Sequence, residues 1–92
     1  MLLSRDEIEK SISFYGWEWG ENAIHKTFNF DKYTDGVDFV NSIAEISETM
    51  NHHAVILLEF CCVKISIFSH DLGGVSTKCI NLATKIDQVN VI

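Results

Sequence analysis

Basic residues are scarce in this sequence, with seven lysines and arginines against thirteen acidic residues and a formal charge of −6. Affinity for nucleic-acid phosphates depends on clustered lysine and arginine, and the sequence contains no such cluster. Anionic membrane surfaces are disfavoured for the same electrostatic reason. The charge balance therefore predicts neither a direct nucleic-acid partner nor a membrane partner.

The sequence also lacks a hydrophobic run long enough to cross a membrane. Residues 54–68 form an apolar stretch, but they include Glu59 and Lys64 and fall short of the ~20 residues that a spanning helix needs. At the N-terminus, Met-Leu-Leu-Ser-Arg-Asp-Glu brings acidic residues too early for the apolar core of a signal peptide. The three cysteines, without a secretory signal, favour reduced thiols. We expect a cytoplasmic protein, with the nucleus as the alternative location.

The residues that are present suffice for one folded domain. The chain has 92 residues, of which 47% are hydrophobic and 22% charged, a balance typical of globular proteins rather than disordered ones. This length fits a single domain over residues 1–92. The core of so short a chain is thin, and its many aliphatic side chains favour self-association.

The first thirty residues predict a helix followed by a β-hairpin. Residues 4–14 begin with Ser4 and carry Glu7 three positions later, which is a capping-box pattern, and a glycine ends the helix. Residues 17–19 and 22–30 alternate between their two sides around a Gly-Glu-Asn turn. The side chains expected on the apolar sides are Ile8, Ile12 and Phe14 in the helix, Trp17 in the first strand with Trp19 at the rim, and Ile24, Lys26, Phe28 and Phe30 in the second strand.

The remaining residues predict a helix, a second hairpin and a last helix. The hydrophobic period of a helix extends from residue 34 or 35 to about residue 51, with acidic residues in the first turns, as the helix dipole favours. Residues 55–69 exceed the roughly 3–10 residues of one strand, so we expect them to turn back at residues 59–62. The sequence has no proline, and no glycine or asparagine marks this turn. The expected core positions are Val37, Val40, Ile43, Ala44, Ile46, Ser47 and Met50 in the helix, Val63, Ile65 and Ile67 in the last strand, and Ile80, Ala83, Ile86 and Val89 in a final helix capped by Ser76 or Thr77.

This order of elements predicts an α+β fold with the sequence α-β-β-α-β-β-α. The three helices would pack on one face of a four-stranded antiparallel sheet. The other face and the edges of the sheet would remain open, which again favours an oligomer.

Three of the four histidines fall at the ends of two of these elements. His52 and His53 follow the second helix, and His70 follows the last strand, so three imidazoles would gather at one rim if the two segments pack together. Glu48 lies four residues before His52, and we expect its carboxylate to orient that ring and raise its pKa above the ordinary ~6.5. An imidazole tuned in this way can act as a general acid or base.

Other interpretations of the same residues stay open. The histidines can be solvated side chains at a helix end and in a loop. Three imidazoles can hold a zinc ion, but adjacent histidines fit one coordination sphere poorly, and neither Cys-x-x-Cys nor His-Glu-x-x-His occurs. We therefore expect no metal. Cys61, Cys62 and Cys79 carry no signature of nucleophilic catalysis and are typical of small buried thiols.

The sequence resembles the pterin-4a-carbinolamine dehydratase family over nearly its whole length. The resemblance lies in Glu48-Thr-Met-Asn-His-His, Phe60, Ser69-His70-Asp-Leu-Gly-Gly-Val-Ser and Ile80-Asn-Leu-Ala, together with Gly16-Trp17, Ala23-Ile24 and Phe28-x-Phe30. It implies the fold described above, a homodimer or homotetramer, and a hydro-lyase that needs no metal or organic cofactor. The implied reaction is dehydration of 4a-hydroxytetrahydrobiopterin to the quinonoid dihydropterin, which regenerates the cofactor of aromatic amino acid hydroxylases.

The resemblance also implies roles for individual residues. His52 and His70 would be the acid/base pair, His53 would bind the pterin and support proton transfer, and Glu48 would orient His52. The substrate would lie against Asn51, His52, His53, Phe68, Ser69 and His70. Which histidine is the acid and which the base stays open. The sequence departs from the family's usual residues at Asn51 in place of an acid, Ala54 in place of proline, Ile56 in place of an aromatic residue and Cys79 in place of an acid.

A second function is compatible with the same resemblance. Some members of the family act as dimerisation cofactors of homeodomain transcription factors and use helix surfaces instead of the pterin site. The substitutions at Asn51, Ala54 and Cys79 keep open a non-catalytic interaction module on the same fold.

Overall fold

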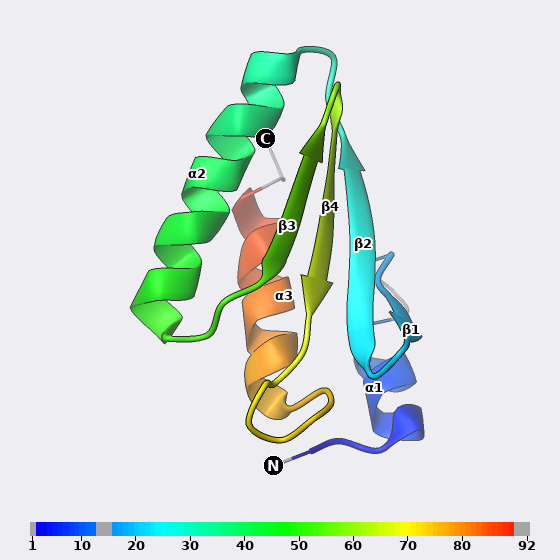
Figure 1. Cartoon of the computed structure of the whole chain (residues 1–92). Coiled ribbons are helices and arrows are strands. Elements are labelled where there is room, and N and C mark those ends of the chain that lie inside the picture. The colour runs from blue at the N-terminus through cyan, green and yellow to red at the C-terminus, as the bar shows by residue number, and fades with distance from the viewer. Residues whose placement is uncertain (1, 13–15, 90–92) are drawn as a thin grey trace.

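The computed structural model describes residues 2–12 and 16–89. The elements follow one another as α1 (Arg5–Ile12), β1 (Glu18–Gly20), β2 (Ala23–Asn29), α2 (Tyr33–Met50), β3 (Val55–Glu59), β4 (Cys62–Ile67) and α3 (Thr77–Val89). The strands form an antiparallel sheet of four in the order β1-β2-β4-β3. The three helices pack on one face of this sheet, with α2 and α3 beside each other (Figure 1). The predicted α+β fold is confirmed.

Helix α1 begins as its sequence indicates. The hydroxyl of Ser4 accepts a hydrogen bond from the backbone N–H of Glu7 at 3.2 Å, and the Glu7 carboxylate accepts one from the backbone N–H of Ser4 at 2.9 Å. Hydrogen bonds from the backbone N–H of Ser4 and from its hydroxyl hold the pKa of the Glu7 carboxyl below its usual value. Ile8 is buried as expected. The predicted packing of Ile12 and Phe14, and the end of the helix beyond residue 12, lie outside what the structure describes.

The first hairpin turns at Glu21 and Asn22, which have φ angles of 54° and 62°. Left-handed backbone at both central residues is characteristic of the type I′ turn, whose twist matches that of the two strands. Strand β2 therefore begins at Ala23 rather than at residue 22. Trp17 is buried and Trp19 is half-buried, as predicted for core and rim.

The buried face of α2 differs from the predicted one. Ala44 is exposed, and Val37 and Val40 are only half-buried, whereas Gly36 and Phe39 face the core with Ile43 and Ser47. The cause lies at Gly36, where a Cβ would be 3.2 Å from Leu58 Cδ1 and 3.5 Å from Val63 Cγ2. The absence of a side chain lets α2 approach the sheet along this line, and Phe39 then packs on Phe28 with ring centroids 4.7 Å apart.

Ser47 carries a buried hydroxyl that has no hydrogen-bond partner among the described residues. An unsatisfied buried hydroxyl costs free energy, and alanine is the better helix former, so Ser47→Ala should raise the free energy of unfolding by about 1 kcal/mol. Urea denaturation measures the change. Ser42→Ala is the matched control, because the Ser42 hydroxyl donates to the Asp38 carbonyl at 3.2 Å. A loss of stability in Ser47→Ala would contradict the prediction.

The second hairpin turns at Phe60 and Cys61, inside the predicted interval of residues 59–62. The turn had no glycine or asparagine to mark it, yet Cys61 adopts a φ of 59° and its carbonyl accepts a hydrogen bond from Phe30 N–H at 2.9 Å. Along β4, the side chains of Val63, Ile65 and Ile67 are buried, as predicted. Strand β3 is an edge strand that exposes about half of Val55 and Leu57.

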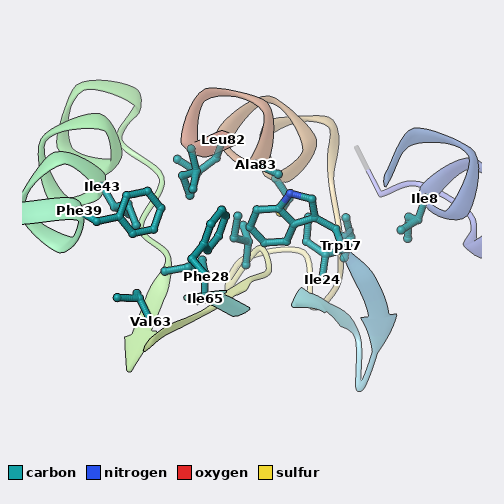
Figure 2. Close-up of a cluster of buried hydrophobic side chains, with 14 residues drawn as sticks. Ile8, Trp17, Ile24, Phe28, Phe39, Ile43, Val63, Ile65, Leu82 and Ala83 are labelled. Carbon is teal, nitrogen blue, oxygen red and sulfur yellow. The ribbon is translucent and has the colours of Figure 1, made fainter. Parts of the chain in front are cut away.

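The core lies between the sheet and the helices. Figure 2 shows Phe28 packed between Phe39 of α2 and Trp17 of the first hairpin. Helix α3 contributes Cys79, Leu82, Ala83 and Ile86, whereas the predicted core residues Ile80 and Val89 are only half-buried. Among the described residues, no helix combines the length and the hydrophobicity needed to span a bilayer.

Candidate active site at the ends of α2 and β4

The last turn of α2 places the histidine pair. Asn51 takes the left-handed conformation, with φ 51° and ψ 42°. Its N–H donates to the Glu48 carbonyl at 3.2 Å, and the N–H of His52 donates to the Ser47 carbonyl at 3.0 Å. These two hydrogen bonds form a Schellman motif, which ends the helix and turns the chain out of its axis. His52 and His53 therefore leave α2 in directions that differ from those of a continued helix.

Two substitutions of Asn51 distinguish the role of its backbone conformation from the role of its side chain in ending the helix. Asn51→Ala should cost about 1 kcal/mol of stability, because a Cβ-bearing residue without a polar side chain is disfavoured in the left-handed region. Asn51→Gly should keep the wild-type stability, because glycine adopts this region without steric cost. Thermal unfolding measures both changes. If the Gly variant is as unstable as the Ala variant, the side chain of Asn51 and not its backbone conformation governs the helix end.

The loop after β4 forms the other wall and is built around Ser69. The Ser69 N–H donates to the Gly74 carbonyl at 2.7 Å, and the Ser69 carbonyl accepts from Gly73 N–H at 2.8 Å. The Ser69 hydroxyl accepts from Leu72 N–H at 3.3 Å. Ser69 is buried. Its side chain therefore stabilises the loop and also belongs to the candidate site.

His52 lies half-buried at the junction of α2 and α3. Its Nε2 is 3.2 Å from Sγ of Cys79. Burial lowers the pKa of His52, and the positive charges of Lys78, His53 and His70 lower it further. The lowered pKa favours the neutral form of the ring.

Glu48 contacts a different histidine from the one that the sequence indicated. Its Oε2 pairs with Nε2 of His53, and both side chains are exposed. The expectation that Glu48 orients His52 and raises its pKa is wrong in this structure. The i, i+4 spacing places two side chains together only within a continuous helix, and the left-handed Asn51 interrupts the helix between them.

His70 is exposed at the end of β4. Its ring lies against Phe68, with centroids 4.5 Å apart and the planes tilted by 55°. The imidazole therefore has an aromatic contact while the side chain stays exposed.

A hollow of about 450 Å³ lies between these segments. It is lined by Asn51, His52, Ser69, Asp71, Leu72, Ser76, Thr77 and Lys78. The structure thus brings together three of the predicted residues, whereas Phe68 lines a separate hollow with His25 and Val55. His53 and His70 line neither of these two hollows.

Sequence reasoning missed the contribution of the α3 N-terminus, which supplies Ser76, Thr77 and Lys78 to the wall and Cys79 to the contact with His52. The available signal was the run Ser-Thr-Lys-Cys at the start of a helix, directly after the loop that carries His70. Within residues 2–12 and 16–89, no three or more His, Cys, Asp or Glu side chains are arranged to hold a metal ion.

Comparison with known proteins agrees with the resemblance noted from the sequence. The sequence profile described as pterin 4 alpha carbinolamine dehydratase matches residues 1–89. The chain therefore belongs to the pterin-4a-carbinolamine dehydratase family.

Among its relatives, a provisionally named pterin-4-alpha-carbinolamine dehydratase of Sulfurisphaera tokodaii is 34% identical over 88 residues, which cover 95% of each chain. One from Roseiflexus sp. (strain RS-1), also provisionally named, is 35% identical with the same coverage.

Two solved structures share the fold. A protein described as a transcriptional coactivator/pterin dehydratase from Brucella melitensis superposes with a TM-score of 0.91 at 23% identity, covering 97% of this chain and 98% of that one. A pterin dehydratase-like protein, described as a RuBisCO assembly factor in the alpha-carboxysome, superposes with a TM-score of 0.68 at 20% identity, covering 82% of this chain and 87% of that one. At these identities the two superpositions establish the fold alone.

Proposed function

We propose that this protein is a 4a-hydroxytetrahydrobiopterin dehydratase, a hydro-lyase that acts by histidine general acid/base catalysis. The observation that supports the proposal is the placement of His52 at a hollow between α2 and α3, with His53 next to it in sequence and His70 in the loop after β4, in a chain that belongs to the dehydratase family. The adjoining hollow of about 450 Å³ is within the usual size of a site for a small molecule, roughly 300–1,000 Å³.

The reaction needs two proton transfers. The hydroxyl on C4a leaves as water after it receives a proton, and N5 loses a proton as the quinonoid product forms. Two imidazoles beside the substrate can perform both transfers without a cofactor, each contributing about 10²–10⁴-fold. We assign the transfers to His52 and His70. His53, paired with Glu48, would bind the pterin together with Asn51, Phe68 and Ser69, of which Asn51 and Ser69 line the hollow beside His52.

The direct test is to add 4a-hydroxytetrahydropterin to the purified protein and follow its ultraviolet decay. The proposal expects acceleration over the spontaneous reaction at catalytic protein concentration, without added metal. An unchanged decay rate would refute the enzymatic function.

We further propose that the protein assembles as a homodimer or homotetramer. Within residues 2–12 and 16–89, strand β3 pairs on one side only, and its residues Val55 and Leu57 are 51% and 53% exposed. Exposed apolar edge strands pair readily with another copy. Light scattering coupled to size-exclusion chromatography measures the assembly, and a strictly monomeric protein at micromolar concentration would contradict it.

A non-catalytic interaction module is the second candidate, and one surface favours it. Phe60 is 81% exposed at the tip of the second hairpin, where its ring stacks on that of Tyr33 with centroids 6.5 Å apart. Aromatic side chains at such exposure are typical anchors of protein interfaces. A pull-down that recovers a partner lost in Phe60→Ala, together with absent dehydratase activity, would favour this function.

A further inference from the structure

A buried chain of polar groups ends at His52. Cys79 is fully buried on the inner side of α3, and its Sγ lies 3.2 Å from Nε2 of His52 and 3.5 Å from Oγ of Ser76. Ser76 is also buried, with 4% of its surface exposed. Nδ1 of His52 has no hydrogen-bond partner among residues 2–12 and 16–89, so it is the nitrogen left for a ligand.

The direction of these hydrogen bonds follows from counting protons and acceptors. The Ser76 hydroxyl has Cys79 Sγ as its hydrogen-bond partner among the described residues. If the thiol donated to Ser76, the buried hydroxyl proton would have no acceptor, at a cost of about 1–3 kcal/mol. In the opposite direction Ser76 donates to Sγ and the thiol donates to Nε2, so the hydroxyl proton and the thiol proton each have an acceptor. An imidazole nitrogen is also a better acceptor than a thiol sulfur.

We propose that Cys79 is a positioning residue that holds neutral His52 with its proton on Nδ1 and its lone pair on Nε2. His52 then offers an N–H donor to a bound ligand and cannot accept a proton at Nδ1. For catalysis this rests on the proposed dehydratase function: His52 gives its Nδ1 proton to the departing hydroxyl, which leaves as water, and His70 accepts the N5 proton. Exchange with solvent then returns a proton to His52 and removes one from His70.

The tautomer can be measured without any substrate. In ¹⁵N-labelled protein at a pH well above the ordinary imidazole pKa, two-bond ¹H–¹⁵N correlations distinguish a protonated from a bare ring nitrogen. We expect His52 to show a protonated Nδ1 and a bare Nε2. A protonated Nε2 in the wild-type protein would overturn the proposal.

His25 is an internal control in the same spectrum. Its Nε2 lies 2.9 Å from the Gly20 carbonyl, which can only accept, and its Nδ1 lies 2.8 Å from the Ser66 hydroxyl. His25 must therefore carry its proton on Nε2, the reverse of His52. Its signals should stay unchanged in every variant at position 79.

Two substitutions test the role of the thiol. Cys79→Asp replaces a donor by a carboxylate that only accepts, so the proton of His52 should move to Nε2. Cys79→Ala removes the partner and should shift the population towards Nε2–H; it also serves if the Asp variant does not fold. A wild-type tautomer in either folded variant would overturn the proposal.

The pH midpoint of the His52 titration provides a second test of the contact between His52 and residue 79. The groups that bear on this ring are Lys78 and Cys79 of α3, His53 after α2, His70 after β4 and Asp71 in the loop. None of the others is altered in Cys79→Asp, so the new carboxylate should raise the midpoint of His52 by about one pH unit. An unchanged midpoint would contradict the contact.

The outcome is separable from that of the proposed function. If the wild-type protein does not accelerate pterin dehydration, the dehydratase proposal fails whatever the spectrum shows. If dehydration is accelerated and Nε2 of His52 carries the proton, only the proposal for Cys79 fails.

Discussion

His70→Ala is expected to lower kcat for pterin dehydration by about 10²–10⁴-fold, the usual contribution of a general acid or base. The side chain is exposed, and Phe68 is its ring contact, so its removal opens no core cavity. The melting temperature should therefore stay at the wild-type value. Stopped-flow absorbance and thermal unfolding of the same preparation measure the two quantities.

A matched control separates the loss of the imidazole from the loss of a surface side chain. Glu45 is also exposed, lies within α2 and does not line the hollow. Glu45→Ala should retain the wild-type kcat and melting temperature. A His70→Ala variant with wild-type kcat would remove His70 from the catalytic pair.

Asp87→Ala is expected to lower the free energy of unfolding by about 3 kcal/mol, which is large for one substitution. The carboxylate accepts a hydrogen bond from Trp17 Nε1 at 2.9 Å and forms an ion pair with Lys26 Nζ at 2.7 Å. Both charged side chains are mostly buried, with 20% and 16% of their surface exposed. Removing the carboxylate deprives the buried indole N–H of its acceptor and the ammonium of its ion pair.

Urea denaturation of three variants resolves this effect into its parts. Trp17→Phe removes the indole hydrogen bond and should cost about 1 kcal/mol through that bond. Glu9→Ala breaks the ion pair with Arg5, whose side chains are 69% and 50% exposed, and should change stability by no more than about 0.5 kcal/mol. An Asp87→Ala variant as stable as Glu9→Ala would show that burial adds nothing to the Asp87 interactions.

The fold could be predicted from the sequence where local chemistry decides it. Two examples are the capping box at Ser4 and Glu7 and the alternation of side chains along β4. Both involve residues that are close in the sequence, so the sequence alone is enough to recognise them. The face of α2 could not be predicted, because it depends on Leu58 and Val63 entering the space above Gly36. Hydrophobic periodicity alone predicts that Val37 faces the core in preference to Gly36, whereas the contacts with the sheet place Gly36 in the core.

In the candidate site, too, some features could be predicted from the local sequence and others depend on tertiary contacts. The positions of the histidines just after α2 and in the loop after β4 could be predicted from the order of helices and strands. The partner of Glu48 could not be predicted in this way. The i, i+4 spacing indicated His52, but the helix ends at the left-handed Asn51, and Glu48 pairs with His53. The contact between His52 and Cys79 joins residues 27 positions apart, and nothing in the local sequence indicates it.

Helix α3 carries both the contact of Cys79 with His52 and the contacts of Asp87 with Trp17 and Lys26. Cys79 and Asp87 lie eight residues apart, or about 12 Å along the helix axis. A helix resists compression along its axis, so the attachment of Asp87 to Trp17 and Lys26 at one end sets how far the helix projects at the other. The location of the thiol beside His52 is therefore fixed from the opposite end of the core, and a substitution in the first hairpin can alter the candidate site without touching any residue in it.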